Sequence, residues 1–425
     1  MLKNPAVPSR PGVSGLLLVV LALLNTVAPF ATDMYLPAFT DMADDLGAGA
    51  SSVQLTLTAF LIGLAVGQLT IGPLSDRFGR RVPLLIATCA ATAAAVVCAL
   101  SPNVWVLVAA RFVQGFAGAA GIVIGRAVAA DRTGGQAAAK VFSLLTSISG
   151  IAPVVAPLAG GLLVPAGWRM EFWALTGISA LMLLGALLVV PESLPPERRH
   201  RGGLAATGRT MRHLLADRGY LGYILTFGLG FTGLMGYISA SPFVIKNVLG
   251  LSTSAYSADF AVNALGMVTA GLINARLIGR FTPQGLLGFG QGAVLTGSAA
   301  LLAMLAAGAP AAAVLPVLFL TVSCVAFVMG NSAALALGRA RHASGTGAAM
   351  MGALQFACGA LVSPLVGLGG EETGVPMGIA LVTAAVLGIG AHLLARTVPA
   401  SRSAAPEPRE GEGPRAEPAQ QATGR

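Results

Sequence analysis

Twelve long apolar runs restrict what this chain can fold into more than any other feature of its sequence. Each run is long enough to cross about 30 Å of hydrocarbon as an α-helix. Only 10% of the residues are charged, against about 25% in a soluble domain. The sequence therefore predicts an all-α, multi-pass membrane protein with twelve transmembrane helices. The runs fall near residues 14–39, 51–74, 82–100, 104–127, 138–164 and 168–191, and then near 220–241, 254–278, 283–307, 311–335, 343–369 and 374–396.

The spacing of the runs divides the chain into four regions. We expect an N-terminal six-helix bundle over 1–191, a charged linker over 192–219 and a C-terminal six-helix bundle over 220–397. Residues 398–425 are rich in Pro, Ala, Arg and Glu, a composition typical of a disordered tail.

Two short motifs occur in corresponding places in the two bundles. They are Gly79-Arg80-x-x-Pro83, repeated as Gly279-Arg280-x-x-Pro283, and Pro157-Leu158-x-Gly160, repeated as Pro364-Leu365-x-Gly367. Such repeats favour two pseudo-symmetric bundles, the architecture of alternating-access transporters, with a binding site between them near the membrane midplane.

Basic residues are divided unevenly between the two sides of the predicted bundle. Loops on one side, such as 40–50 and 370–373, are acidic, and the only basic residues there are Arg169 and Lys246. The positive-inside rule then places both termini in the cytoplasm of a plasma membrane, which we take to be bacterial. The net charge of +9 is distributed over these loops and does not indicate nucleic-acid binding.

The cysteines and histidines give no sign of a catalytic or metal site. All four cysteines lie in apolar runs and none forms a CxxC pair, so we interpret them as packed thiols. The histidines are scattered, and we expect them on the cytoplasmic side. The chain also lacks a GxxxxGK[ST] loop, so we expect no enzyme activity, no metal and no cofactor, with the proton gradient as the energy source. The residues concerned are Cys89, Cys98, Cys324, Cys358, His200, His213, His342 and His392.

Asp33 is the single carboxylate inside the first apolar run. A charge within a membrane span costs about 2.5–3.5 kcal/mol on insertion scales, so such an acid usually has a function. We therefore predict that Asp33 carries a proton. The alternative is that Asp33 lies at the level of the outer headgroups.

In the fourth span, Arg111, Gln114, Gly115 and Gly118 share one helix face. Small residues there allow close helix packing, and a buried arginine needs an acceptor. Asp33 lies ~12 Å and Arg111 ~10 Å below the same surface, so we expect them to act as one proton-coupling unit. Burial and a nearby cation act in opposite directions on a carboxyl group, which permits proton exchange near neutral pH. The alternative is an arginine that extends outward to water.

Residues 72–81 read GPLSDRFGRR and join the second and third spans. This loop resembles the signature G-x-L-x-D-R-x-G-R-[RK] of the major facilitator superfamily. The resemblance implies a latch between the two halves, whereas the counterpart in the second half has no acid. A basic loop that only sets orientation is the alternative. The gating residues implied are Gly72, Asp76, Arg77, Gly79 and Arg80.

The fourth and fifth spans also resemble antiporter motifs of that superfamily. Residues 111–115 match R-x-x-Q-G, and residues 157–161 match the end of G-P-x-x-G-G, with Ala156 in place of its first glycine. Proline frees a carbonyl group and kinks a helix. A kinked helix that only packs is the alternative. The kink residues implied are Pro153, Pro157, Gly160 and Gly161.

The sequence TDMYLP at 32–37, together with 344–348 and Gln355-Phe356, resembles the bicyclomycin/chloramphenicol resistance group of drug:proton antiporters. The resemblance implies efflux of an amphipathic drug, such as a chloramphenicol-like or bicyclomycin-like compound, in exchange for protons. The partners would be a small amphipathic substrate, protons and the lipid bilayer, and we expect a monomer. Asn25 stands where some related exporters carry a further acid.

Polar and aromatic residues of three spans are candidates for the substrate cavity. In the seventh span, three aromatic residues recur at intervals of four and could form a wall or simply pack against a neighbour. Three other functions stay open, namely export of an endogenous metabolite, lipid enzymology and sensing without transport. The cavity candidates are Asn25, Thr26, Tyr35, Gln114, Tyr223, Phe227 and Phe231.

Overall fold

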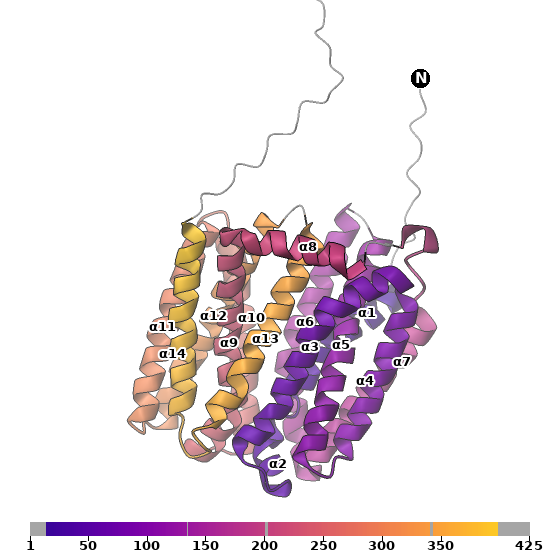
Figure 1. The fold of residues 1–425 in the computed structure, drawn as a ribbon. Helices are drawn as coiled ribbons and strands as arrows, with labels where there is room; N and C mark the ends of the chain where they lie inside the picture. The colour runs from indigo at the N-terminus through magenta and orange to yellow at the C-terminus, as the bar shows by residue number, and fades with distance from the viewer. Residues whose placement is uncertain (1–13, 134, 200–202, 341–342, 398–425) are drawn as a thin grey trace, which may run out of the picture.

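The computed structural model describes residues 14–133, 135–199, 203–340 and 343–397. Within these ranges, twelve helices are long and apolar enough to cross a membrane. They run side by side in one bundle (Figure 1). The predicted all-α membrane fold is confirmed. The expected tail, 398–425, lies outside the described residues.

The six spanning helices of the first set pack mainly against one another. α3 lies along α5, α4 lies between α5 and α7, and α1 contacts α5, α6 and α7. Their bounds are α1 (Gly15–Asp33), α3 (Ala50–Phe78), α4 (Arg81–Ala99), α5 (Val104–Arg132), α6 (Gly135–Leu163) and α7 (Trp168–Val189).

The second set repeats this pattern of packing. α9 contacts α12, α13 and α14, while α11 lies against α12 and α14, and α10 lies against α12. Contacts between the sets run mainly along α3 with α13 and along α6 with α10. The bounds are α9 (Arg218–Phe243), α10 (Thr253–Leu277), α11 (Pro283–Ala306), α12 (Ala311–Arg339), α13 (Ser344–Gly367) and α14 (Val375–Arg396).

Glycines permit the closest approaches within the first set. A Cβ atom on Gly115 of α5 would lie 2.1 Å from the carbonyl oxygen of Phe60, and one on Gly160 of α6 would lie 1.8 Å from that of Met34. Real side chains cannot occupy these positions without moving the backbone. The small residues of the fourth and fifth spans therefore bring α3 against α5 and α6 against the end of α1.

Two short helices mark the two ends of the bundle. α8 (Gly203–Ala216), in the linker, lies across one end, which we call the α8 end, and α2 (Phe39–Asp45) lies at the opposite, α2 end (Figure 1). Leu214 of α8 is buried while Arg209 and Arg212 are exposed, so α8 is amphipathic. Only a charged linker was predicted for this segment.

The first apolar run, predicted over 14–39, is not one continuous helix. α1 ends at Asp33, and the 3₁₀-helix η1 (Leu36–Ala38) then leads into α2. Pro37 in the first turn of η1 fixes φ near the helical value and favours a new start there. Asp33 consequently lies at the C-terminal end of a helix, just before the point where the helical run is interrupted. The remaining short elements are η2 (Val164–Ala166), η3 (Pro196–Arg198) and the π-helix η4 (Val244–Val248).

Candidate functional site

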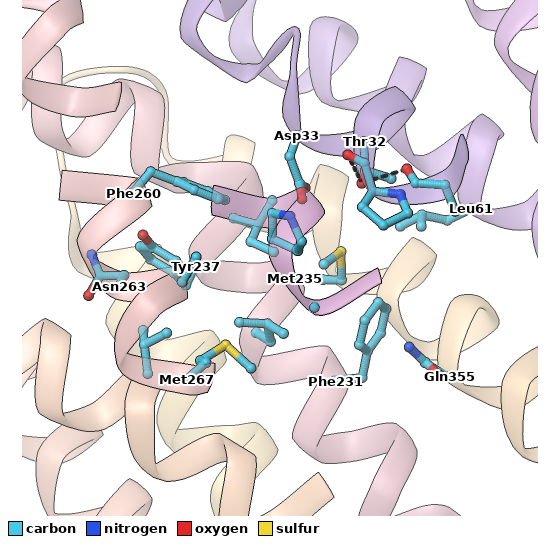
Figure 2. Close-up of a pocket in the computed structure, with 18 of the residues that line it drawn as sticks. Thr32, Asp33, Leu61, Phe231, Met235, Tyr237, Phe260, Asn263, Met267 and Gln355 are labelled. Carbon is cyan, nitrogen blue, oxygen red and sulfur yellow. Dashed lines mark hydrogen bonds between the residues drawn. The ribbon is translucent and has the colours of Figure 1, made fainter. Parts of the chain in front are cut away.

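A cavity of about 360 Å³ lies between the two sets of helices. Its walls come from α1, α3 and α6 of the first set and from α9, α10, α12 and α13 of the second. Most lining side chains are aromatic or aliphatic (Figure 2). Volume and lining are those of a site for a small, largely apolar ligand with a few polar contacts.

Asp33 is the only charged residue among the described residues that line this cavity. Its side chain is 4% exposed and projects from the end of α1 (Figure 2). Among the described residues, no Lys, Arg or His forms an ion pair with it. The C-terminal end of a helix carries partial negative charge and gives a carboxylate no compensation. The site therefore holds an acid in apolar surroundings without a neutralising cation.

Arg111 of α5 is fully buried behind α1. It donates from Nη1 to Gln114 Oε1 at 2.7 Å and from Nη2 to the carbonyl oxygen of Ala31 at 2.7 Å. Its guanidinium group also lies 4.4 Å from the ring centre of Tyr35 and 4.2 Å from that of Phe60. Cation–π contacts and a backbone acceptor thus take the place of a carboxylate partner.

Asp33 and Arg111, which we expect to act as one proton-coupling unit, share no ion pair or hydrogen bond in the described part of the chain. Arg111 instead contacts the carbonyl oxygen of Ala31. Residues two apart on a helix point about 200° from each other, so Ala31 and Asp33 face opposite sides of α1. Equal depth was the basis of the expectation, and depth does not determine which way a side chain points.

Of the seven expected cavity residues, Phe231 alone lines this cavity. Tyr223 and Phe227 are buried on the same helix, but Tyr223 lies eight residues, or ~12 Å, further along α9. The Tyr223 ring packs against His392, with 6.2 Å between the centres. The aromatic stripe therefore serves packing at one end and the cavity at the other.

The remaining four candidates bond within the first set of helices. Asn25 Oδ1 accepts from Arg126 Nε at 3.3 Å, and the Thr26 hydroxyl donates to the carbonyl oxygen of Leu23 at 2.8 Å. Tyr35 shares a 3.1 Å hydrogen bond with Thr56, and Gln114 holds Arg111. None lines the cavity in this conformation.

Several cavity residues were not proposed from the sequence. Tyr237 of α9 and Phe260 and Asn263 of α10 line the wall formed by the second set (Figure 2). Gln355 and Phe356, singled out above only for a resemblance, line it as well. A polar pair inside the apolar run 254–278 was the available signal, since Asn263 bonds to the half-buried carboxylate of Asp259 four residues earlier.

His392 lies near the end of α14 that is at the α8 end of the bundle (Figure 1), and it is buried there. It lies within α14, is 5% exposed, and its Nδ1 is 2.6 Å from Gln291 Oε1. His200 and His342 lie outside the described residues. The four cysteines are free, and no group of three potential metal ligands exists in the described part of the chain.

The loop at the end of α3 holds a network centred on Arg80. Arg80 is 8% exposed and bonds to Asp76, to Asp131 at 3.2 Å and to the Ser75 hydroxyl at 2.7 Å. Gly79 adopts φ +94°, a conformation that favours glycine. The loop is thereby tied to the end of α5.

Two further gating candidates are less constrained. Arg77 is exposed and lies 5.3 Å from the ring centre of Phe78. A Cβ atom on Gly72 would meet only Val123, at 3.6 Å. Neither belongs to the Arg80 network.

Glu192, just after α7, fixes the same loop from the linker. It accepts the backbone N–H of Arg80 at 2.8 Å and that of Arg81 at 3.3 Å. Burial alone would raise the pKa of Glu192, but these donors, Leu194 N–H and Arg199 outweigh it and hold the pKa below its usual value. The ionised carboxylate is therefore the form that stabilises this junction.

Hydrogen bonds between the two sets of helices gather at the α2 end. Lys246 of η4 donates to the carbonyl oxygen of Pro37 at 3.1 Å and lies 3.7 Å from Asp41. Gln54 of α3 donates to the carbonyl oxygen of Ser239 at 3.0 Å. The Ser51 hydroxyl donates to the carbonyl oxygen of Pro364 at 3.3 Å. This conformation is therefore closed at the α2 end.

Comparison with known proteins gives one family and several relatives. The model of the Major Facilitator Superfamily matches residues 21–364. The uncharacterized MFS-type transporter YdgK of Bacillus subtilis is 40% identical over 391 residues, 91% of this chain and 96% of the relative. The bicyclomycin resistance protein homolog of Haemophilus influenzae is 30% identical over 384 residues, covering 88% and 94%.

A solved structure agrees in fold. The xylose transporter XylE from E. coli, in a partially occluded inward open conformation, superposes with a TM-score of 0.71 at 16% identity and covers 90% of this chain and 97% of its own. At that identity the likeness concerns the arrangement of helices alone.

Proposed function

Because this chain belongs to the Major Facilitator Superfamily, we propose that it exports an amphipathic drug or antibiotic in exchange for protons. It is a multi-pass membrane transporter and not an enzyme. Relatives named for bicyclomycin resistance and multidrug resistance support the assignment to drug efflux. They agree with the resemblance found in TDMYLP and in the loop at 72–81.

One observation carries this proposal, namely an acid without a counter-ion in a drug-sized apolar cavity. Asp33 is the only charged group on the described cavity wall, and neutralisation by a proton removes most of the cost of burying it. A substrate that enters the cavity competes with that proton for the Asp33 carboxylate. Binding of one would therefore release the other, which is the basis of antiport.

The structure suggests how the exchange would be coupled to movement. The α2 end is held shut by Lys246 and Gln54, so access would come from the α8 end in this conformation. Rocking of the two sets of helices about the cavity would break these bonds and expose the site at the α2 end. Because Arg111 holds the last turn of α1 through Ala31, it would transmit a change at Asp33 to α5.

Sidedness follows from charge. We place the α8 end, with both termini, in the cytoplasm of a bacterial plasma membrane, because the basic loops gather there. The α2 end would then face outward, and the contacts of Lys246 with Pro37 and Asp41 would form the outer gate. We propose that the protein acts as a monomer and needs no cofactor.

The test replaces the acid by its neutral isostere. Asp33→Asn should abolish pH-gradient-driven efflux of ethidium and chloramphenicol from proteoliposomes while the purified variant still binds them. Glu372→Gln, at an exposed residue between α13 and α14, is the control and should transport like the parent. Drug binding to the parent should also release protons into weakly buffered solution. Full proton coupling in Asp33→Asn would exclude this role.

A further inference from the structure

Asn263 and Tyr237 place two buried polar atoms on the cavity wall formed by the second set of helices (Figure 2). Asn263 is 1% exposed and Tyr237 is 2% exposed. Asn263 Oδ1 and the Tyr237 hydroxyl are close enough to interact with each other, but neither forms a hydrogen bond with any other described residue. An amide oxygen and a hydroxyl oxygen each have two lone pairs, and buried polar groups are nearly always satisfied. The spare acceptor capacity of this pair beside a cavity therefore indicates a place for a ligand donor.

The orientation of the Asn263 amide is fixed by Asp259, one turn earlier on α10. Asn263 donates from Nδ2 to Asp259 Oδ2 at 2.9 Å and to the Asp259 carbonyl oxygen at 3.0 Å. Both partners are acceptors, so the nitrogen must point to them. Asn263 Oδ1 is therefore left as an acceptor, with a carboxylate on the other side of the same amide.

The surroundings favour a positively charged donor. Tyr237 stacks on Phe260 with 5.8 Å between ring centres and 20° between planes, and aromatic faces attract cations. No Lys, Arg or His belongs to the described cavity wall. An N–H group with positive charge would meet an acceptor, a hydroxyl and two aromatic rings, and no repelling cation.

We propose that Asn263 and Tyr237 form a subsite that binds a cationic group of the substrate that bears N–H donors. Asp259 is a positioning residue, because it acts through Asn263 by orienting the amide and adding negative charge behind it. This inference rests on the proposed export function and assigns the two acids different tasks. Asp33 handles the proton on the first set of helices, and the Asp259–Asn263–Tyr237 group recognises cargo on the second.

The test compares two probes that differ in charge. Ethidium is a cation with amino groups, and chloramphenicol is neutral. Equilibrium binding of both is measured on the purified full-length protein for the parent, Asp259→Asn, Asn263→Leu and Tyr237→Phe. Ethidium should bind about tenfold more weakly to each variant, since Asn263→Leu and Tyr237→Phe each lose a charge-assisted contact and Asp259→Asn loses the negative charge that orients and polarises the Asn263 amide. Chloramphenicol affinity should stay within about twofold, which also shows that the variants are folded.

Two further variants separate a specific from a general effect. Ser323→Ala removes another buried hydroxyl that has no partner in the described part of the chain but lies outside the cavity lining, so both affinities should stay at parental values. Asp259→Glu keeps the negative charge and should recover part of the ethidium affinity. No such recovery is expected if Asp259 only packs against its neighbours.

Each other outcome decides the matter. Unchanged ethidium binding in the variants would mean that only water contacts Asn263 and Tyr237. An equal loss of affinity for both probes would mean that these residues have a structural role. Either result overturns the subsite. A parent that binds chloramphenicol but not ethidium overturns it while leaving export intact. A parent that exports neither probe contradicts the proposed function and this inference with it. If Asp33→Asn keeps proton coupling while these shifts occur, the subsite stands and the proton role fails.

Discussion

The two sets of helices share a packing pattern but differ in what they bury. All four buried Asp, Glu, Lys and Arg side chains of the described residues lie in the first set, whereas the buried polar side chains of the second are Ser, Thr, Asn, Gln and His392. The difference suggests a division of labour, with charge and gating in one repeat and cargo recognition in the other. The four residues are Asp33, Arg80, Arg111 and Glu171.

The repeated glycine of the Pro-Leu-x-Gly motif gives the comparison with the largest expected effect. A Cβ atom on Gly160 would lie 1.8 Å from the backbone oxygen of Met34 inside the first set. One on Gly367 would meet atoms of α3 across the two sets, the side-chain oxygen of Gln54 at 2.1 Å and the Cα of Ser51 at 2.8 Å. Gly160→Ala should cost about 1–3 kcal/mol of stability and lower the unfolding temperature. Gly367→Ala should leave that temperature nearer the parental value and weaken closure at the α2 end.

Thermal unfolding in detergent, together with labelling of a cysteine introduced at Ser51, measures both effects. Gly177→Ala is the control, because nothing lies within 4 Å of the added methyl group. Equal destabilisation by the two substitutions would remove the distinction between a contact within one repeat and a contact between repeats.

The paired loops give the second comparison. Arg80 is buried in a network with Asp76 and Asp131, while its counterpart Arg280 is exposed and has no ion pair in the described part of the chain. Arg80→Ala should reduce transport about tenfold, because loss of a buried ionic contact is costly, without changing drug binding in detergent. Arg280→Ala should transport within about twofold of the parent. Similar losses in initial-rate efflux assays would contradict an asymmetric latch.

The smallest expected effect concerns two acids at opposite ends of the bundle, Glu371 at the α2 end and Glu192 at the α8 end. Burial, and next the nearby Asp44, raise the pKa of Glu371, although Asn247 donates to it. Its ionised form therefore disfavours the closed α2 end, and this cost appears as pH rises from the ordinary value for glutamate through the raised one. For Glu192, whose pKa is lowered, stabilisation is present above the ordinary value and is lost as pH falls.

The corresponding measurement is the distance between spin labels at Ser52→Cys and Thr373→Cys as a function of pH. Acidification should increase the closed population in the parent, and Glu371→Gln should flatten this pH dependence, because the substituted side chain can no longer lose a proton. Glu372→Gln, at an exposed neighbour, should keep the parental profile. A parental profile in Glu371→Gln would show that another group controls the gate.

Hydropathy alone predicted the twelve spans, because a membrane demands about twenty apolar residues for each crossing. The direction in which each helix points was much harder to predict. Lipid and protein interior are both apolar, so a spanning helix lacks the polar face that orients a helix in water. Asn25 and Gln114 were thus expected in the cavity but bond to Arg126 and Arg111.

The rule that identified Asp33 applies equally to Asp259. Both are single carboxylates inside apolar runs, and applying the rule to every run would have found Asp259 and its partner Asn263. The amphipathic helix α8 was visible in the alternation of Arg209 and Arg212 with Leu214. The partner of Arg111 was not predictable, since a backbone carbonyl leaves no trace in sequence.

A single acid on the cavity wall also determines how membrane voltage acts on this transporter. If Asp33 exchanges one proton for one singly charged cation, no net charge crosses, and only the pH difference can drive export. A neutral cargo exchanged for the same proton moves one charge inward. A potential of 100 mV then adds about 2.3 kcal/mol, or roughly a fiftyfold concentration ratio. Export of a cation would thus be driven by the pH difference alone, whereas export of a neutral cargo would be driven by both the pH difference and the membrane potential.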